Sequence, residues 1–310
     1  SGAITQTDDI TIDVATGKTL TYSGAEISLG AKTLTLSGGG TLTNTNALIL
    51  NNANSKLLLN SITLGSARTS ADSLGLDVDA DSSVSSLRVT KITPVSIAAG
   101  KSLSGAITVS GGSLKLTEAG TLASSIEMIC CGGTLDADET FTVSGALTQT
   151  ADNTIDIATG KTLTYSGAAV SLGANTLTLR GGGTLTNTNA IKLDNADSKL
   201  LLNSITVGSI STSLANSGLD VDANSTVTSL TVGHTTPVSI SPGKTLSGGI
   251  TVTGGSIKLD EAGTLGSTVS MSGGTLDADE TSTISGAITQ TDDITIDVAT
   301  GKTLTYSGAE

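Results

Sequence analysis

The sequence predicts an all-β protein: a parallel β-solenoid (β-helix) with about 20 residues per coil and essentially no α-helix. Three observations support this fold class. The chain repeats a long unit almost unchanged, each unit breaks into short runs with strand periodicity, and the composition supplies small aliphatic residues but almost no aromatic ones. Internal repeats of this kind indicate a stacked architecture in which each coil buries its apolar side against its neighbours.

The repeat has clear boundaries. Residues 1–26 return letter for letter at 285–310, and a looser copy of the same phrase begins at Ser144. We therefore expect repeat unit 1 at 1–143, repeat unit 2 at 144–284 and the start of the next repeat at 285–310. Repeat unit 1 is slightly longer than repeat unit 2, and the small insertion that causes the difference lies near Ile129 and Cys130. We expect the chain to be a section of a longer tandem array.

Strand periodicity runs through the whole first unit. Apolar residues alternate with Thr, Ser, Lys or Asp, which is typical of strands with one buried face. The expected strands are, in order, Ile10–Val14, Lys18–Tyr22, Lys32–Leu36, Gly40–Asn44, Lys56–Asn60, Leu74–Val78, Leu87–Thr90, Ala106–Ser110, Ser113–Thr117 and Phe141–Gly145. No stretch keeps apolar residues at the i, i+3, i+4, i+7 spacing of a helix, so we expect essentially none.

The spacing of these strands predicts the coil. Strand starts recur on average every ~20 residues, which predicts about seven coils per repeat of 141–143 residues. They fall at Ile4, Ile27, Leu48, Ile62, Leu87, Ile107, Ile126 and Leu147. Punctuating phrases such as TGK and SGGG suit the corners of a coil better than tight hairpins. We expect three faces per coil and a rise of about 4.8 Å from one coil to the next.

Composition narrows the possible functions. Hydrophobic residues make up 37% of the chain, aromatic residues 1%, and there is no Trp, which predicts a narrow core of small aliphatic side chains. The net charge of −13 disfavours nucleic acid as a partner. No apolar run approaches the ~20 residues that span a bilayer, so we expect no membrane insertion.

Three phrases resemble a known class of protein. They are GKTLTYSG from Gly17, AKTLTLSGGGTLTNTNA from Ala31 and GGSLKLTEAGTL from Gly111. These resemble the repeats of large bacterial surface proteins: autotransporter passenger domains, filamentous-haemagglutinin-like adhesins and giant repetitive extracellular filament proteins. The resemblance implies a β-solenoid displayed outside the cell, at the cell surface, in adhesion, spacing or filament building. It supplies no catalytic residues.

Acidic clusters are the candidate metal ligands. Asp77, Asp79 and Asp81 form a DxDxD pattern, which Asp220 and Asp222 echo in the second unit. The pattern lacks the Gly and Glu of an EF-hand, since Ser82 and Arg88 stand at the sixth and twelfth places. These five aspartates are candidate Ca²⁺ ligands, and Ca²⁺ is the one cofactor considered. The alternative, solvated turn aspartates, is favoured by turn chemistry.

Other constellations carry less chemistry. The acids recur in both repeats, as architectural residues do, and the lone His234 has Lys91 at the matching place, so we expect no enzymatic activity.

Thr-x-Thr runs such as Thr41–Thr43 resemble the threonine arrays of ice-binding solenoids, although outward threonines are ordinary on strands. Asparagines are expected to stack in side-chain ladders. Cys130 and Cys131 are expected to bulge outward at the insertion, and a half-buried, unreactive pair is favoured over a thiol that joins chains.

Together these observations predict a non-enzymatic extracellular solenoid that forms a rod, fibre or filament from tandem repeats. The stalk of a cell-surface adhesin and an ice-binding threonine array are the alternatives. Uncapped strand edges predict end-to-end self-association with other copies or repeats, and rods that also associate laterally are considered.

Overall fold

A computed structural model describes residues 4, 6–215 and 217–308 of the chain, and every regular element in this part is a β-strand. The all-β prediction is confirmed. The chain divides into two compact units, one made of Ser1–Asn153 and Leu163–Ala168, the other of Thr154–Thr162 and Ala169–Glu310. Across the described ranges there is no helix with the length and hydropathy that a membrane span requires.

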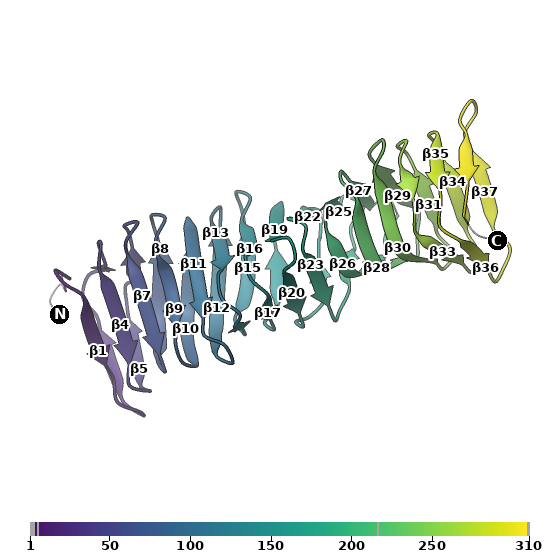
Figure 1. The fold of residues 1–310 in the computed structure, drawn as a ribbon. Coiled ribbons are helices and arrows are strands. Elements are labelled where there is room, and N and C mark those ends of the chain that lie inside the picture. Colours follow the sequence, from purple (N-terminus) through teal and green to yellow (C-terminus); the bar gives the residue numbers. More distant parts are fainter. Residues whose placement is uncertain (1–3, 5, 216, 309–310) are drawn as a thin grey trace. The chain divides into compact units, whose positions relative to one another are not determined.

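In unit 1, one strand of each coil belongs to a parallel sheet that we call face A. Neighbouring strands of this face are hydrogen-bonded in chain order and lie side by side in Figure 1. They are β1 (Ile10–Asp13), β4 (Thr33–Ser37), β7 (Lys56–Asn60), β9 (Gly75–Val78), β11 (Ile92–Ile97), β13 (Ser113–Leu116) and β16 (Thr134–Ala137). These seven strands match the seven coils expected for one repeat.

The other strands of unit 1 complete each coil. They are β2 (Thr19–Tyr22), β3 (Ile27–Ser28), β5 (Thr41–Asn44), β6 (Leu48–Leu50), β8 (Thr63–Thr69), β10 (Ser82–Val89), β12 (Ser102–Ser110), β14 (Thr121–Leu122), β15 (Ser125–Ile129), β17 (Phe141–Val143), β18 (Leu147–Gln149) and β20 (Thr162–Tyr165). In some coils two short strands share this part, and in others one long strand covers it. β8 pairs with β5 at its start and with β6 at its end.

Unit 2 repeats this plan. Its face A contains β19 (Asn153–Ile157), β22 (Thr176–Arg180), β25 (Lys199–Asn203), β27 (Gly218–Val221), β29 (Thr236–Ile240), β31 (Ser256–Leu259), β34 (Thr275–Ala278) and β37 (Thr295–Val298). Its remaining strands are β21 (Val170–Ser171), β23 (Thr184–Asn187), β24 (Ile191–Leu193), β26 (Thr206–Thr212), β28 (Ser225–Val232), β30 (Thr245–Val252), β32 (Thr264–Leu265), β33 (Thr268–Met271), β35 (Ser282–Ile284), β36 (Ile288–Gln290) and β38 (Leu304–Tyr306). The strand pairs within each unit are parallel, so the predicted parallel β-solenoid is confirmed.

The register of face A measures the coil length directly. Leu57 pairs with Leu76, and Leu200 pairs with Leu219 at the matching place in unit 2, so this coil has the same length in both units. The insertion shows itself in one later coil. Leu116 pairs with Ala137, whereas the equivalent Leu259 pairs with Ala278, so this coil is longer in unit 1. One corner, after β15 in unit 1 and after β33 in unit 2, therefore absorbs the whole length difference between the repeats.

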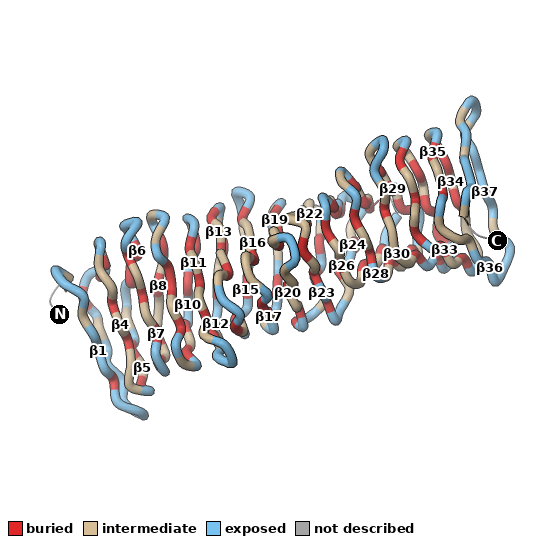
Figure 2. The backbone as a smooth tube through the Cα atoms, in the orientation of Figure 1, coloured by how far each residue is buried: buried red, intermediate tan, exposed pale blue. Residues whose placement is uncertain are grey.

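The core is a column of aliphatic side chains. Buried and half-buried residues alternate along the strands, as Figure 2 shows by its alternating colours. In β4 the inward Leu34 and Leu36 have no exposed surface, and Leu57 and Leu59 of β7 lie next to them in register. Tyr165 is a buried tyrosine in the core of unit 1, and its hydroxyl group is hydrogen-bonded. Its hydroxyl accepts a 3.0 Å bond from the Leu147 amide and donates a 2.7 Å bond to the Ala168 carbonyl.

Glycines make the corners that the sequence predicted. In each of the Gly-Lys pairs the glycine has a φ between 72° and 79°, a backbone conformation that residues with a side chain rarely adopt. The following lysine amide closes the turn on a carbonyl three residues back, as Lys101 does on Ala98 at 2.9 Å. The glycines are Gly17, Gly100, Gly160, Gly243 and Gly301. These pairs are therefore turns of the coil, as expected.

Candidate functional site

The first candidate site is the acidic cluster of unit 1. Asp77 lies outward on β9, and its carboxylate is 2.6 Å from Lys56 Nζ on β7. Asp81 lies at the next corner, where one carboxylate oxygen accepts bonds from the Ser102 amide (2.8 Å) and hydroxyl (3.0 Å). Asp79, between them, is exposed and follows the end of the strand. Two of the three carboxylates thus already have protein partners in neighbouring coils.

Unit 2 repeats the first of these contacts. Lys199 Nζ of β25 lies 2.6 Å from the Asp220 carboxylate of β27, and Asp222 lies just beyond the strand. The hydrogen bond with Asp220 raises the pKa of Lys199, against the opposing effect of burial. Within the ranges that the structure describes, no three His, Cys, Asp or Glu side chains gather in a cluster that could hold a metal ion. Calcium binding stays a prediction.

Further ion pairs link neighbouring strands of face A near the end of each repeat. Lys115 of β13 lies 3.2 Å from Asp136 of β16 and 2.7 Å from Asp138. The hydrogen bond with Asp138 is the largest cause that raises the Lys115 pKa. In unit 2 the equivalent Lys258 lies 2.6 Å from Asp279. Because both repeats keep these pairs, we assign them to coil stacking.

Hydroxyl side chains form columns along the solenoid. In unit 1, one column runs through Thr19, Thr41, Thr63, Ser83 and Ser104, which are paired coil to coil. Ser83 donates a 3.0 Å bond to Thr63 within it. In unit 2, a second position gives the column Ser211, Thr231, Thr251, Ser270 and Thr289. We call these two sets the hydroxyl columns.

On face A the threonine column is interrupted. Thr35 of β4 is followed in its column by Leu58 and then by Asp77. The sequence therefore indicated which motifs carry threonine, but it did not indicate which residues stack above and below each threonine. The pairing register between successive coils determines which columns contain only hydroxyl side chains and which are interrupted.

Asparagines bridge coils through the backbone. Asn44 Oδ1 accepts a 2.8 Å bond from the Ser66 amide, and Asn44 Nδ2 donates 2.8 Å bonds to the Ser66 and Asn46 carbonyls. Asn46 in turn donates to the Gly24 carbonyl at 2.8 Å. These amides bond to main-chain groups of adjacent coils, which differs from the expected amide-to-amide ladder. A main-chain partner satisfies the amide while also fixing the adjacent coil.

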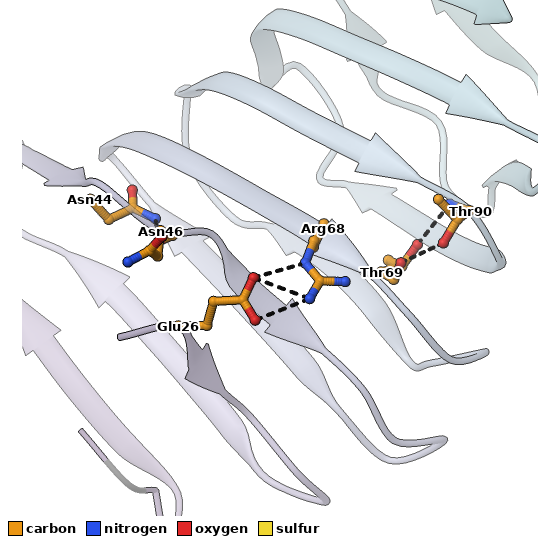
Figure 3. A network of polar contacts seen from close by, with 6 residues as sticks. All are labelled: Glu26, Asn44, Asn46, Arg68, Thr69 and Thr90. Atoms are coloured by element: carbon orange, nitrogen blue, oxygen red, sulfur yellow. Dashed lines mark hydrogen bonds and ion pairs between the residues drawn. The ribbon is translucent and has the colours of Figure 1, made fainter. Parts of the chain in front are cut away.

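An ion pair crosses two coils beside these asparagines (Figure 3). Arg68 Nε and Nη2 lie 3.3 Å and 3.1 Å from Glu26 Oε1, and Nη2 is also 3.1 Å from Oε2. Both side chains are more than one-third exposed, so this pair contributes little stability. The second repeat has Ala169 and Ser211 at the matching places, so the pair is specific to unit 1.

The cysteine pair lies at the inserted corner after β15. Both thiols are exposed, which corrects the half-buried placement favoured from the sequence, while the outward bulge is confirmed. The exposure of the two thiols has a cause in the backbone. Cys130 has a φ of 21° and Cys131 a φ of 67°, so the extra residues loop outward instead of continuing the inward alternation of the strand. Ser110 Oγ lies 3.3 Å from Cys130 Sγ.

Comparisons with protein-family models, with curated proteins and with solved structures gave no match.

Proposed function

We propose that this chain is a structural, non-enzymatic component of an extracellular rod or filament. One observation carries the proposal: in each unit, every coil is joined to the next by parallel backbone hydrogen bonds over an aliphatic core. A β-solenoid of this kind supports a rod-like structural role, because coils added along the stack increase length without changing the cross-section.

Surface chemistry supports the same proposal. The Lys56–Asp77 and Lys199–Asp220 ion pairs occupy matching places in the two repeats, as do the bridges made by Asn44 and Asn187, and all of them join neighbouring coils. Interactions devoted to stacking are what a structural array requires. The net charge of −13 would keep such rods dispersed. An adhesin stalk would use the same construction and differ only in what it carries.

Small-angle X-ray scattering of the full chain tests the proposed rod. We expect a pair-distance distribution with an early maximum and a long linear tail, as rods give. A symmetric, bell-shaped distribution would reject the rod. Pull-down against a glycan panel tests whether the repeats themselves are adhesive. Binding of a glycan would favour the adhesin, whereas a rod, or a stalk whose adhesive part lies elsewhere, should bind none of the glycans.

A second candidate, ice binding, is favoured by the hydroxyl columns alone. Their members are regularly spaced by the coil rise of about 4.8 Å and partly exposed. Thermal hysteresis of the purified protein is the measurement. Activity that disappears in Thr251→Lys, at the centre of the unit 2 column, would establish ice binding. No hysteresis in the unmodified protein would remove this candidate.

A further inference from the structure

The cysteine pair of unit 1 is the most chemically distinctive feature outside the stacking interactions. Cys130, Cys131 and Gly132 have φ values of 21°, 67° and 73° in succession, so the chain turns out of the coil there. Gly111, in the coil before, leaves room for Cys131: a side-chain carbon at Gly111 would lie 3.1 Å from Cys131 Cβ. The corner therefore presents two adjacent thiols to solvent.

A chain of polar contacts, which we call the relay, joins Arg88 through Ser110 to the Cys130 thiol. Arg88 Nη2 of β10 donates to Ser110 Oγ of β12 at 3.5 Å, and Ser110 Oγ lies 3.3 Å from Cys130 Sγ. The Ser110 hydrogen bond is the largest cause that lowers the Cys130 pKa, followed by the hydrogen bond from Cys131 and the charge of Arg88. The hydrogen bond with Cys130 raises the Cys131 pKa. The pKa of Cys130 therefore lies below that of Cys131, so Cys130 is the thiol of the pair that loses its proton more readily.

Charges of both signs surround the pair, and Arg88 is the one that lowers the pKa of Cys130. Arg88 is the register neighbour of Arg68, and these are two of the three arginines in a chain with 28 acidic residues. Other charged groups on the adjoining elements are Lys91 after β10, Glu127 on β15 and Asp152 beside the following coil. Exposed thiolates next to guanidinium groups are the reactive kind, whereas buried apolar cysteines are inert.

A groove lies beside the corner that carries the pair, although neither cysteine lines it. It has a volume of about 260 Å³, and its lining includes Gly111, Gly112 and Gly132 together with Lys91 and Asp72. Three glycines in its wall leave the backbone uncovered, so a small molecule can approach the corner beside Cys131 without displacing side chains.

We propose that Cys130 and Cys131 form a thiol–disulfide exchange site for small anionic disulfides. Cys130 first releases its proton to water. Its thiolate then attacks one sulfur of the disulfide, a Cys130–sulfur bond forms, the original sulfur–sulfur bond breaks, and the second sulfur leaves as a thiolate. The Cys130 sulfur is oxidised and the leaving sulfur is reduced, so electrons balance without another reactant.

Geometry also predicts that the mixed disulfide persists. Cα atoms of consecutive residues are about 3.8 Å apart across a trans peptide, and the described part of the chain contains no cis peptide. Disulfides usually join Cα atoms about 4.4–6.8 Å apart, so attack by Cys131 on the mixed disulfide is disfavoured. Cys131 therefore positions and hydrogen-bonds Cys130 and does not expel the bound thiol.

The second repeat supplies variants that suit the fold. Thr231 and Thr253 stand where unit 1 has Arg88 and Ser110. Arg88→Thr and Ser110→Thr therefore alter the relay with residues that the same architecture already accepts. The matched control is Arg180→Ser, which removes an arginine charge at a site far along the sequence from the cysteines. Serine suits that position because the matching residue of the first repeat is Ser37.

The experiment measures thiol exchange in the full chain, whose two cysteines account for all thiols. Anionic 5,5′-dithiobis(2-nitrobenzoate) and cationic cystamine are the probes. We expect the anionic probe to release one thiolate per chain rapidly. Cys130→Ser should slow this by about tenfold or more, and Cys131→Ser by about twofold, because only the Cys130 thiolate is activated.

The charge variants test the specificity. Arg88→Thr should reduce the ratio of anionic to cationic rates by about threefold. At the matching place in unit 2 the Thr253 hydroxyl donates to the Val232 carbonyl at 3.4 Å, so Ser110→Thr should withdraw the hydrogen bond from Cys130 and raise the pH at which Cys130 reacts. Arg180→Ser should change neither. Circular dichroism establishes that each variant keeps its strands. Equal rates for Cys130→Ser and Cys131→Ser would overturn the proposal, as would an unchanged rate ratio in Arg88→Thr. Rapid release of two thiolates per chain would overturn the persistence of the mixed disulfide.

Discussion

Gly105 of β12 lies so close to Val84 of β10 that a side chain at Gly105 would overlap the Val84 carbonyl. The register slips at this point: Val84 pairs with Gly105, but Leu87 pairs with Ile107, so β10 has one extra residue. Gly248 and Val227 repeat the relationship in unit 2, with the same slip. The β-bulges in β10 and β28 therefore require glycine at the paired position, because only glycine has no side chain to overlap the bulged strand.

Replacing this glycine should therefore be costly. Gly105 has a φ of 117° and no space for a side chain, so we expect Gly105→Ala to lower the free energy of unfolding by more than about 2 kcal/mol. Gly100→Ala is the matched control. Gly100 also has a positive φ, 72°, but open space around it, so only strain of about 1 kcal/mol applies. Urea unfolding measures both, and equal losses would contradict the bulge argument.

The buried asparagine bridge makes a second prediction. Asn187 is 7% exposed, and its amide bonds to the Ser209 amide at 3.0 Å and to the Ser209 carbonyl at 2.7 Å. Asn187→Ala leaves these main-chain groups without partners, so stability should fall by about 1–3 kcal/mol. Asp197→Ala, at an exposed turn, should change stability by less than about 0.5 kcal/mol. A similar change in both variants would show that the bridge does not hold the coils.

Core packing makes the third prediction. Leu116 has no exposed surface, so Leu116→Ala should leave a cavity and cost about 2–5 kcal/mol. Ile92, on the same face but 50% exposed, is the control, and Ile92→Ala should cost less than about 0.5 kcal/mol. Thermal unfolding by circular dichroism gives the comparison. If Leu116→Ala were tolerated as well as the control, the narrow core would not be the source of stability.

The fourth prediction concerns pH. Burial, followed by the charge of Asp279, raises the pKa of Asp277. The folded protein then holds that proton more tightly than the unfolded chain, so stability falls as pH rises from the ordinary aspartate pKa through the raised one. Asp277→Asn should increase stability at pH 7 by less than about 1 kcal/mol, since water screens this half-exposed carboxylate.

The same variant should lose its advantage in acid. Below pH ~3 the Asp277 carboxyl is protonated in both folded and unfolded chains, so the variant and the parent should be equally stable. Asp293→Asn, at an exposed position, should leave stability unchanged at both pH values. An advantage of Asp277→Asn that persisted at low pH would assign the effect to packing rather than to charge.

The sequence predicts the solenoid well because its signals are local. Alternation in runs such as Thr33–Leu36, together with the left-handed glycines of the Gly-Lys corners, indicates strands and turns without knowledge of the neighbouring coils. The coil length follows from the spacing of such runs. The short strand β14 was missed because two residues carry no periodicity, whereas the start of β3 at Ile27 was predicted from the coil spacing.

Features that depend on register between coils could not be predicted. Whether Thr41 belongs to an unbroken hydroxyl column, or Asn44 reaches a main-chain amide, depends on which residue lies one coil away. The exposure of Cys130 depends on a corner conformation that no pattern in the sequence specifies. The relay from Arg88 to Cys130 joins residues that are far apart in the sequence, and only the stacking of β10, β12 and β15 brings them together.

Electron cryo-microscopy of the native assembly can decide whether stacked coils make this protein a structural rod. A rod should give elongated particles or filaments whose power spectrum has an axial reflection near about 4.8 Å, with strands perpendicular to the long axis. Compact particles, or elongated ones that lack this axial spacing, would contradict it.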